Sequence, residues 1–254
     1  IHQKLSDFIS NSKEKLHLKG ALGSSLTFSV ATIFKSSDRP FLLIFDSKEE
    51  AAYYLNDFEM LLDDKEVLFY PGSYRRPYQI EETDNANVLL RAEVLSRINS
   101  QKKPALIVTY PQALFEKVVS RKQLEQSTFK VAVGDIISLD FFNEILFEYQ
   151  FSRVDFVTDP GEFSVRGGIV DVFSFSHDEP YRIEFFGDEV DTIRTFDVES
   201  QLSIKTLKKI HILPNIEHKS INETRQSFLE YISANTVIFA KDIPSFLDTT
   251  DALQ

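Results

Sequence analysis

The chain has 254 residues, of which 43% are hydrophobic and 26% charged, a composition typical of a globular protein with one large or two small domains. Its net charge of −11 argues against the whole chain being a nucleic-acid clamp, because phosphate binding needs a basic surface. The absence of Cys excludes a disulfide framework, and without a secretory pattern or a membrane-spanning apolar run we expect a cytoplasmic fragment, beginning at Ile1, of a longer protein.

Helical patterns and short apolar runs alternate over the first 124 residues. Apolar positions three and four apart predict helices over residues 5–18, 27–37, 47–62 and 83–100. Continuous apolar runs predict strands that are buried on both faces over residues 40–46, 66–72 and 104–110. Strands that alternate with helices indicate a parallel α/β sheet.

The pattern changes near residue 125. A strand, a turn and a helix capped by Ser138 are predicted over residues 129–151. Close strands with glycine turns, which are typical of antiparallel pairing, follow over residues 153–175, 181–197 and 208–215. After Pro214 the first pattern returns, with a helix over residues 220–234 and a strand over 236–242.

These patterns predict an α/β fold in which one domain interrupts another. Residues 1–124 and 213–254 would form a parallel-sheet domain of the P-loop type, and residues 125–212 an inserted α+β domain with an antiparallel sheet. Domain insertion is tolerated when the termini of the inserted part lie close together.

The stretch GALGSSLTF, Gly20 to Phe28, resembles a phosphate loop with the motif G-x-x-x-x-G-K-[ST]. Ser25 replaces the second glycine and adds a Cβ where the loop needs positive φ, and Leu26 replaces the lysine and cannot donate to a phosphate. We therefore predict a loop without nucleotide, while the helix dipole leaves weak anion binding open. The degenerate loop comprises Gly20, Gly23, Ser24, Ser25, Leu26 and Thr27.

No pattern predicts catalysis. A nucleotide hydrolase needs a metal-binding acid after an apolar strand, and the one tempting match is Asp188–Glu189. Gly187 before these acids and a second strand directly after them favour a hairpin turn. None of the five histidines has another at ligand spacing, and no G-x-S-x-G stretch is present. We expect no catalytic residue, metal or cofactor in this chain.

Two surfaces remain as candidates for binding. In the strand YRIEFF, alternation places Tyr181, Ile183 and Phe185 on one face and Arg182, Glu184 and Phe186 on the other. If the first face is core, Phe186 lies among charges as in an interface hot spot; alternatively, Phe186 packs under a neighbouring element and the arginines pair with carboxylates such as Glu184. The pattern leaves both open. A basic aromatic loop over residues 70–82, with Arg75 and Arg76, could contact nucleic acid, but a long α/β loop is the more ordinary interpretation.

The segment from Glu162 to Asp197 resembles a known family. Its R-G pair, its E-F-F-G-D-E run and its I-R pair also occur in UvrB, the helicase subunit of nucleotide excision repair. Over nearly its whole length the chain is similar to the UvrB-homology module at the N-terminus of bacterial transcription-repair coupling factors, the Mfd family. The GALGSS loop, the FYPG strand end, the VTYPQAL strand and the ILP re-entry follow in family order.

The resemblance implies a partner and its contacts. In this family the P-loop is degenerate, and ATP and Mg²⁺ serve a motor in a later part of the chain that is absent here. The inserted domain of the family binds UvrA through residues that match Arg166, Arg182 and Phe186, with Arg194 as a neighbour.

The resemblance therefore implies a non-catalytic module that recruits UvrA to stalled RNA polymerase. A distant domain would mask its UvrA-binding face, and the polymerase and DNA would be contacted by absent domains. Two alternatives are an ATPase or helicase lobe that uses the GALGSSLTF loop, and a DNA-binding module.

Overall fold

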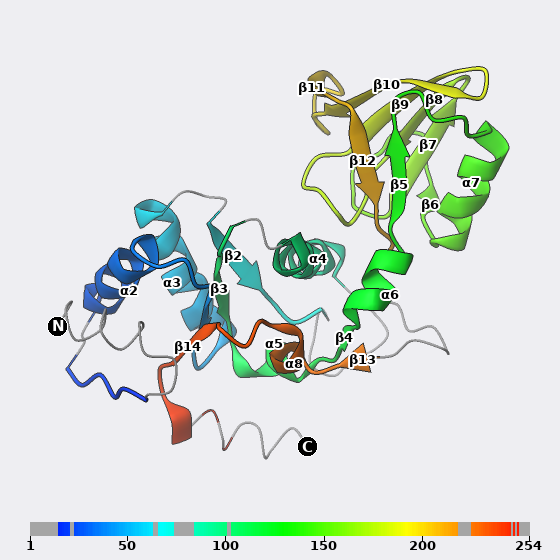
Figure 1. Cartoon of the computed structure of the whole chain (residues 1–254). Helices are drawn as coiled ribbons and strands as arrows, with labels where there is room; N and C mark the ends of the chain where they lie inside the picture. Colours follow the sequence, from blue (N-terminus) through cyan, green and yellow to red (C-terminus); the bar gives the residue numbers. More distant parts are fainter. Residues whose placement is uncertain are drawn as a thin grey trace. The chain divides into compact units, whose positions relative to one another are not determined.

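A computed structural model of the chain describes residues 15–20, 23–62, 66–73, 84–100, 103–217, 225–244, 246 and 248. By its contacts the chain divides into two compact units (Figure 1), one with Ile1–Gly72, Val94–Lys117 and Gln226–Gln254, the other with Ser73–Glu93 and Val118–Arg225. The domain boundaries 1–124, 125–212 and 213–254 stay a prediction, because contacts within the folded chain do not measure whether residues 125–212 fold without the rest of the chain.

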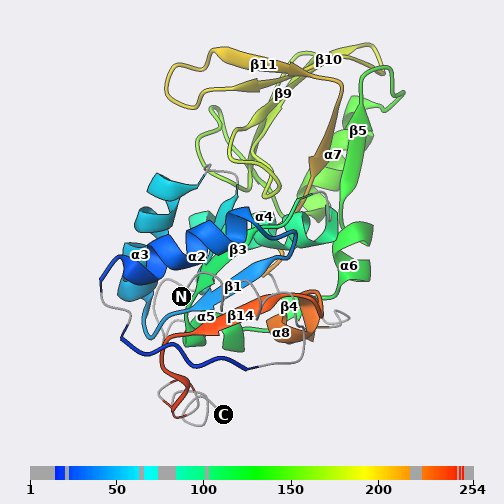
Figure 2. The ribbon, with the colours of Figure 1, turned by 60° about the vertical axis from the view of Figure 1, so that its left-hand side comes forward.

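The first unit contains a four-stranded sheet in which every pairing is parallel (Figure 2), as the alternating pattern predicts. Three of its strands are nearly continuous apolar runs, which is why they can be buried on both faces. In spatial order the strands are β14 (Val237–Ala240), β1 (Phe41–Ile44), β3 (Leu106–Thr109) and β2 (Val67–Tyr70).

Helices lie on both faces of this sheet (Figures 1 and 2). Phe41 packs edge-on against Phe34 of α2 (Ser25–Lys35), with ring centroids 5.3 Å apart. Tyr70 stacks on Phe228 of α8 (Phe228–Tyr231) at 4.0 Å. In the register of the sheet, Phe41 of β1 lies in the same row as Val67 of β2. Tyr70 follows Val67 by three residues, an odd number, so the rings of Phe41 and Tyr70 point to opposite faces of the sheet. The unit also contains α3 (Lys48–Leu61), whose N-cap Ser47 accepts from Glu50 N, and α5 (Pro111–Phe115).

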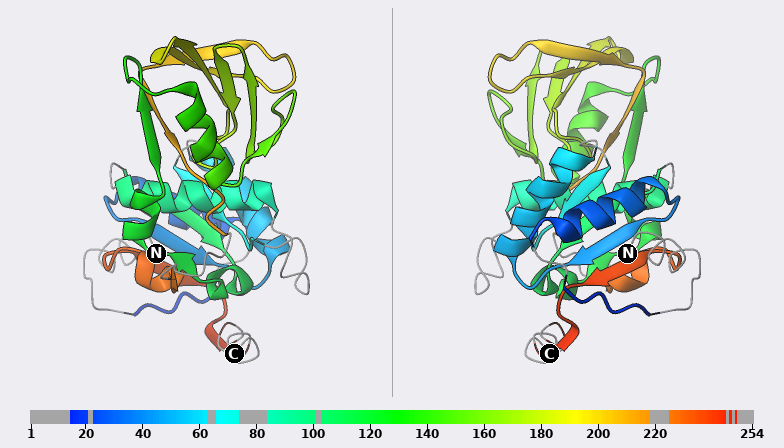
Figure 3. Two further views of the ribbon diagram at one scale, coloured as in Figure 1. Left: turned by 90° about the vertical axis from the view of Figure 1, so that its right-hand side faces the viewer. Right: turned by 90° about the vertical axis from the view of Figure 1, so that its left-hand side faces the viewer.

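The second unit is built around a six-stranded sheet (Figure 3). All its pairings are antiparallel except that of the two-residue strand β6 with β7. In spatial order its strands are β11 (Ser203–Leu207), β10 (Glu189–Phe196), β9 (Tyr181–Phe186), β8 (Ile169–Val172), β7 (Glu162–Arg166) and β6 (Ser152–Arg153). A separate antiparallel ribbon joins β5 (Phe129–Ala132) to β12 (Lys209–Ile212).

Helix α7 (Leu139–Glu148) covers one face of the six-stranded sheet (Figure 3). Its N-cap is Ser138, as predicted, and the serine side chain accepts a hydrogen bond from Phe141 N. Phe142 packs edge-on against Phe185 of β9, and Phe147 against Phe163 of β7, at 5.5 and 5.2 Å between centroids. These contacts make the covered face the core.

Helix α4 (Asn85–Ser100) begins in the second unit, where it supplies a buried ion pair. Arg91 is fully buried and its Nε donates to Glu217 Oε1 at 2.6 Å. Arg225 approaches the other carboxylate oxygen at 3.3 Å. Leu89 of the same helix packs against the buried cluster of Val157, Phe173 and Phe196.

Three expectations about local structure are wrong where the structure describes them. Of the helix predicted over 220–234, residues 220–224 lie outside the described residues. In the described part only the single turn α8 is helical, because residues 225–226 form the strand β13 (Arg225–Gln226), which pairs with β4 (Val118–Val119). The helix predicted over 5–18 does not include residues 15–18, and its earlier part lies outside the described residues. The pattern also missed the short elements β4, α5 and α6 (Arg121–Gln126).

Candidate functional site

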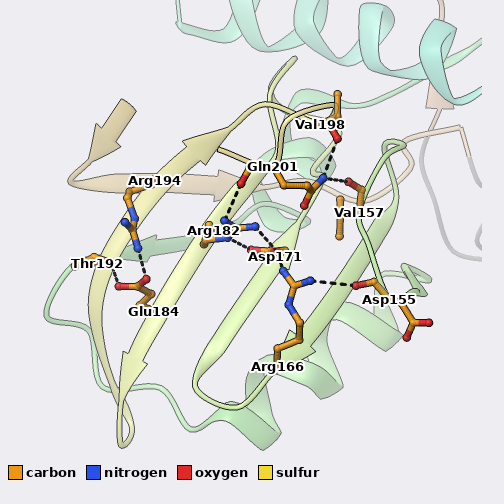
Figure 4. Close-up of polar contacts among 10 residues, drawn as sticks. All are labelled: Asp155, Val157, Arg166, Asp171, Arg182, Glu184, Thr192, Arg194, Val198 and Gln201. Carbon is orange, nitrogen blue, oxygen red and sulfur yellow. Dashed lines mark hydrogen bonds and ion pairs between the residues drawn. The ribbon is translucent and has the colours of Figure 1, made fainter. Parts of the chain in front are cut away.

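The face of the six-stranded sheet opposite α7 carries the polar side chains, and we call it the outer face. Along β9, Tyr181 and Ile183 are buried and Phe185 is half-buried, all toward α7. The alternate residues Arg182, Glu184 and Phe186 therefore lie on the outer face, as the period of two predicts. Neighbouring strands add Arg166, Asp171, Thr192 and Arg194 to the outer face (Figure 4).

Arg166 reaches the outer face because of the glycine pair that follows it. Gly167 and Gly168 form the two-residue connection from β7 to β8, and Gly167 has φ +62°, a value that side chains rarely adopt. A Cβ on Gly168 would lie 2.8 Å from the backbone oxygen of Phe185. Both positions of the connection therefore need glycine, and the tight turn holds Arg166 opposite Ile169.

Asp171 joins two arginines from different strands (Figure 4). Its side chain is fully buried, although it carries a carboxylate. Arg182 donates to it through Nε and Nη2 at 2.7 and 2.9 Å, and Arg166 donates through Nη2. The two charge-assisted bonds of Arg182 are of the bidentate kind, which fixes the plane of the guanidinium. The hydrogen bond with Asp171 raises the pKa of Arg182 further above its usual value, so this arginine stays charged.

Arg182 is also held from its other side. Its Nη1 donates to the backbone oxygen of Gln201 at 3.1 Å, and its guanidinium lies 4.5 Å from the ring centroid of Phe196. Gln201 has a positive φ of 59°, and its side-chain amide donates to Val198 O at 2.8 Å. Only 16% of the Arg182 side chain is exposed, so its orientation is set before any partner arrives.

A second arginine–carboxylate pair lies on the next strand pair. Arg194 of β10 donates to Glu184 of β9, and Thr192 Oγ1 donates to the other oxygen of that carboxylate at 2.8 Å. The side chains of Arg194 and Glu184 are both 31% exposed, so solvent screens this pair more than the Asp171 cluster.

Phe186 and Arg166 are the open members of the outer face. The side chain of Phe186 is 82% exposed at the end of β9. Arg166 is 42% exposed and lies 5.5 Å from the ring centroid of Phe156, itself 64% exposed. The two alternatives drawn from the pattern are thus each right in part, because Phe186 is not covered while the arginines do pair with carboxylates.

The structure places all four predicted partner-binding residues, Arg166, Arg182, Phe186 and Arg194, on the outer face. Sequence reasoning missed Asp171 as the residue that joins two of them. A signal was present, since GIVDVF places a lone acid on the polar side of an otherwise apolar strand. It also missed Phe156 and Gln201, which lie in connecting segments where no period applies.

The GALGSSLTF loop has a partly different geometry from the expected one. Gly20 and Gly23 have positive φ, but Ser25 is the first residue of α2 and has no such φ. The expectation of positive φ at Ser25 is therefore wrong, because the helix already begins at that residue. The hydroxyl of Thr27 is buried and donates to Asp57 Oδ2 of α3 at 3.4 Å. The lysine position is filled by half-buried Leu26.

The other candidates from the sequence are a pair of acids, groups of metal ligands and a basic aromatic loop. Gly187 and Asp188 connect β9 to β10, which confirms the hairpin turn. Among the described residues, no three His, Cys, Asp or Glu side chains gather as metal ligands would. None of the described helices is both long enough and apolar enough to cross a membrane. Arg75 and Arg76 of the basic aromatic loop lie outside the described residues.

The fold and the outer face together define a class of molecule. A parallel α/β unit is combined in one chain with a unit whose antiparallel sheet exposes arginines and aromatic rings. Residues 129–218, within that second unit, match the family model of the UvrB interaction domain.

Similar proteins extend this likeness to most of the chain. The transcription-repair-coupling factor of Bacillus subtilis is 33% identical over 203 residues, which are 80% of this chain and 17% of that protein. That of Rickettsia bellii is 28% identical over 86% of this chain and 20% of the relative. UvrABC system protein B of Thermosipho africanus is 27% identical over 85% of this chain and 34% of the relative. The chain thus spans about a sixth to a third of the length of these proteins, and the resemblance to the UvrB-homology module is confirmed.

Proposed function

We propose that this chain is a non-catalytic recruitment module of a transcription-repair coupling factor that binds UvrA through the outer face of its six-stranded sheet. The observation that carries this proposal is Phe186, which is 82% exposed on the same sheet face as two arginines that a buried carboxylate holds in place. Aromatic and arginine anchors are typical of interface hot spots. The UvrB interaction domain over residues 129–218 and the likeness to coupling factors support the same function.

The residues of the outer face would contribute to UvrA binding in different ways, according to how exposed their side chains are. Phe186 would supply apolar area, and Arg166 would donate charge-assisted hydrogen bonds to carboxylates of UvrA. Arg182 and Arg194 are less exposed, at 16% and 31%, so much of their role would be to hold Asp171 and Glu184 in position. We further propose that the longer protein contacts RNA polymerase and DNA through other domains, one of which masks the outer face.

Phe186→Ala should weaken UvrA binding roughly thirtyfold, because truncating a hot-spot aromatic typically costs about 2 kcal/mol or more. The melting temperature should not fall, since the ring is 82% exposed. Isothermal titration calorimetry with purified UvrA and thermal melting measure the two effects. Phe28→Ala is the matched control, because its ring on α2 is 59% exposed and belongs to the other unit.

Phe185→Ala should behave in the opposite way. It removes a ring that packs on Phe142, so the protein should melt earlier and lose binding only as it unfolds. If Phe186→Ala melted early while Phe185→Ala stayed folded but bound poorly, the outer face would not be the binding face.

We also propose that this chain binds no ATP or Mg²⁺. Leu26 offers no donor to a phosphate, and the Thr27 hydroxyl is buried and bonded to Asp57. Calorimetric titration with millimolar ATP should therefore give no saturable signal. The double variant Ser25→Gly, Leu26→Lys should still show no ATPase activity, because among the described residues no three His, Cys, Asp or Glu side chains gather as metal ligands would. A stoichiometric ATP site, or turnover by the double variant, would instead favour the nucleotide-dependent alternative.

A further inference from the structure

A row of three side chains crosses the end of the β9–β10 hairpin. Phe186 is paired with Glu189 in the β9–β10 register, and Glu189 forms an antiparallel bridge with Ile136 in the segment before α7. The hydrogen bonds on either side of this bridge run from Ile137 N to Asp188 O at 2.7 Å and from Val190 N to Asp135 O at 2.9 Å.

This pattern sets the direction of the side chains. Hydrogen bonds between the flanking residues make Ile136 and Glu189 a non-hydrogen-bonded pair, in which the Cα atoms lie about 4.5 Å apart and the side chains are on the same face. Residues paired across strands share a face, so Phe186, Glu189 and Ile136 all point to the outer face. Phe186 and Ile136 are then roughly 10 Å apart, with Glu189 between them.

The two apolar members are unusually open. Ile136 is 73% exposed and Phe186 82%, which makes them the two most exposed large apolar side chains among the described residues of the second unit. Single exposed apolar residues are ordinary, but two in one row on a sheet form a patch that a partner can bury.

The charges around this row are acidic. Glu189 lies within it, Asp188 is in the hairpin turn, and Asp191 follows on β10; all three are exposed. Of the outer-face arginines, Arg166 lies two rows from Phe186 and is bonded to Asp171, whereas Arg182 and Arg194 lie four rows away. A partner surface that fits this row therefore has an apolar site rimmed by lysines or arginines, since desolvated like charges would oppose binding.

We propose that Ile136 is a second apolar anchor of the partner-binding face, seated with Phe186 on an apolar site of UvrA that basic residues surround. This inference rests on the proposed function and extends the binding face to Ile136, which lies in the segment between β5 and α7. Binding would bury the row from Phe186 to Ile136 and pair Glu189 with a basic group of UvrA.

The experiment is calorimetric titration of UvrA with the wild-type chain, Ile136→Ala, Phe186→Ala, the double variant and Glu189→Lys, each checked by thermal melting. Ile136→Ala should weaken binding at least roughly fivefold without lowering the melting temperature. Glu189→Lys should weaken it more at low salt than at high salt, because screening reduces charge repulsion. The control is Ile204→Ala, which truncates a 54% exposed isoleucine on β11, near the opposite end of β10.

The outcomes separate the two proposals. If the wild type binds UvrA, Phe186→Ala weakens binding and Ile136→Ala does not, the second anchor is wrong and the proposed function stands. Equal losses of UvrA affinity for Ile136→Ala and Ile204→Ala would also overturn the second anchor. If Ile136→Ala changed self-association in sedimentation but not UvrA binding, the row would bind a second copy instead. If the wild type does not bind UvrA, both proposals fall.

Discussion

Replacing Glu217 by alanine should lower the free energy of unfolding of the second unit by about 3–5 kcal/mol, the cost typical of removing one partner of a buried ion pair. The side chain of Arg91 is fully buried, and its Nε lies 2.6 Å from Glu217 Oε1. Without the carboxylate, a guanidinium that cannot lose its proton stays in the interior without its counter-charge.

Urea unfolding followed by circular dichroism measures this loss, and two further variants sharpen it. Arg225→Ala should cost much less, because its guanidinium is partly exposed and lies farther from Glu217, at 3.3 Å. The double variant Arg91→Met, Glu217→Leu should recover much of the stability, since apolar side chains of similar volume often replace a buried pair without loss. A cost below about 1 kcal/mol for Glu217→Ala would mean that the pair behaves like a surface salt bridge.

Asp171→Ala should destabilise the second unit by about 3 kcal/mol and also weaken UvrA binding, because one buried carboxylate holds two arginines. This loss of stability should lie at the lower end of the range for buried ion pairs, because the side chains of Arg166 and Arg182 are 42% and 16% exposed and solvent can hydrate them. Binding should weaken even at temperatures where the variant is folded, because the arginines are then no longer oriented.

Glu184→Ala is the matched control for this prediction. It removes a carboxylate from the same face, but from a pair in which both side chains are 31% exposed, so we expect a loss of no more than about 1 kcal/mol. Urea unfolding and calorimetry with UvrA, run on both variants, give the comparison. Equal losses of stability for the two variants would show that the burial of Asp171 does not set its contribution.

Much of the fold follows from local patterns in the sequence. The apolar runs that become β1, β2 and β3 are short, which favours buried strands over helices, and their alternation with helices indicates a parallel sheet. The period of two in YRIEFF determined that Tyr181 and Ile183 share one face and that Phe186 lies on the other, while packing against α7 decided which face is the core. The N-cap Ser138 and the turn at Gly187 are equally local, because a cap or a tight turn depends on residues within a few positions of each other.

The tertiary structure decided what depends on distant residues. The stretch 225–234 has helical periodicity, yet residues 225–226 pair with β4 and leave only a single turn of helix, because packing overrides a weak local preference. Pairing of β7, β8 and β9 brings Arg166 and Arg182 to the same buried Asp171, and a bridge outside the strands places Ile136 beside Glu189. The sequence alone determined which residues share a face of a strand, whereas long-range strand register determined which of them meet, since register is set by the packing of the whole sheet.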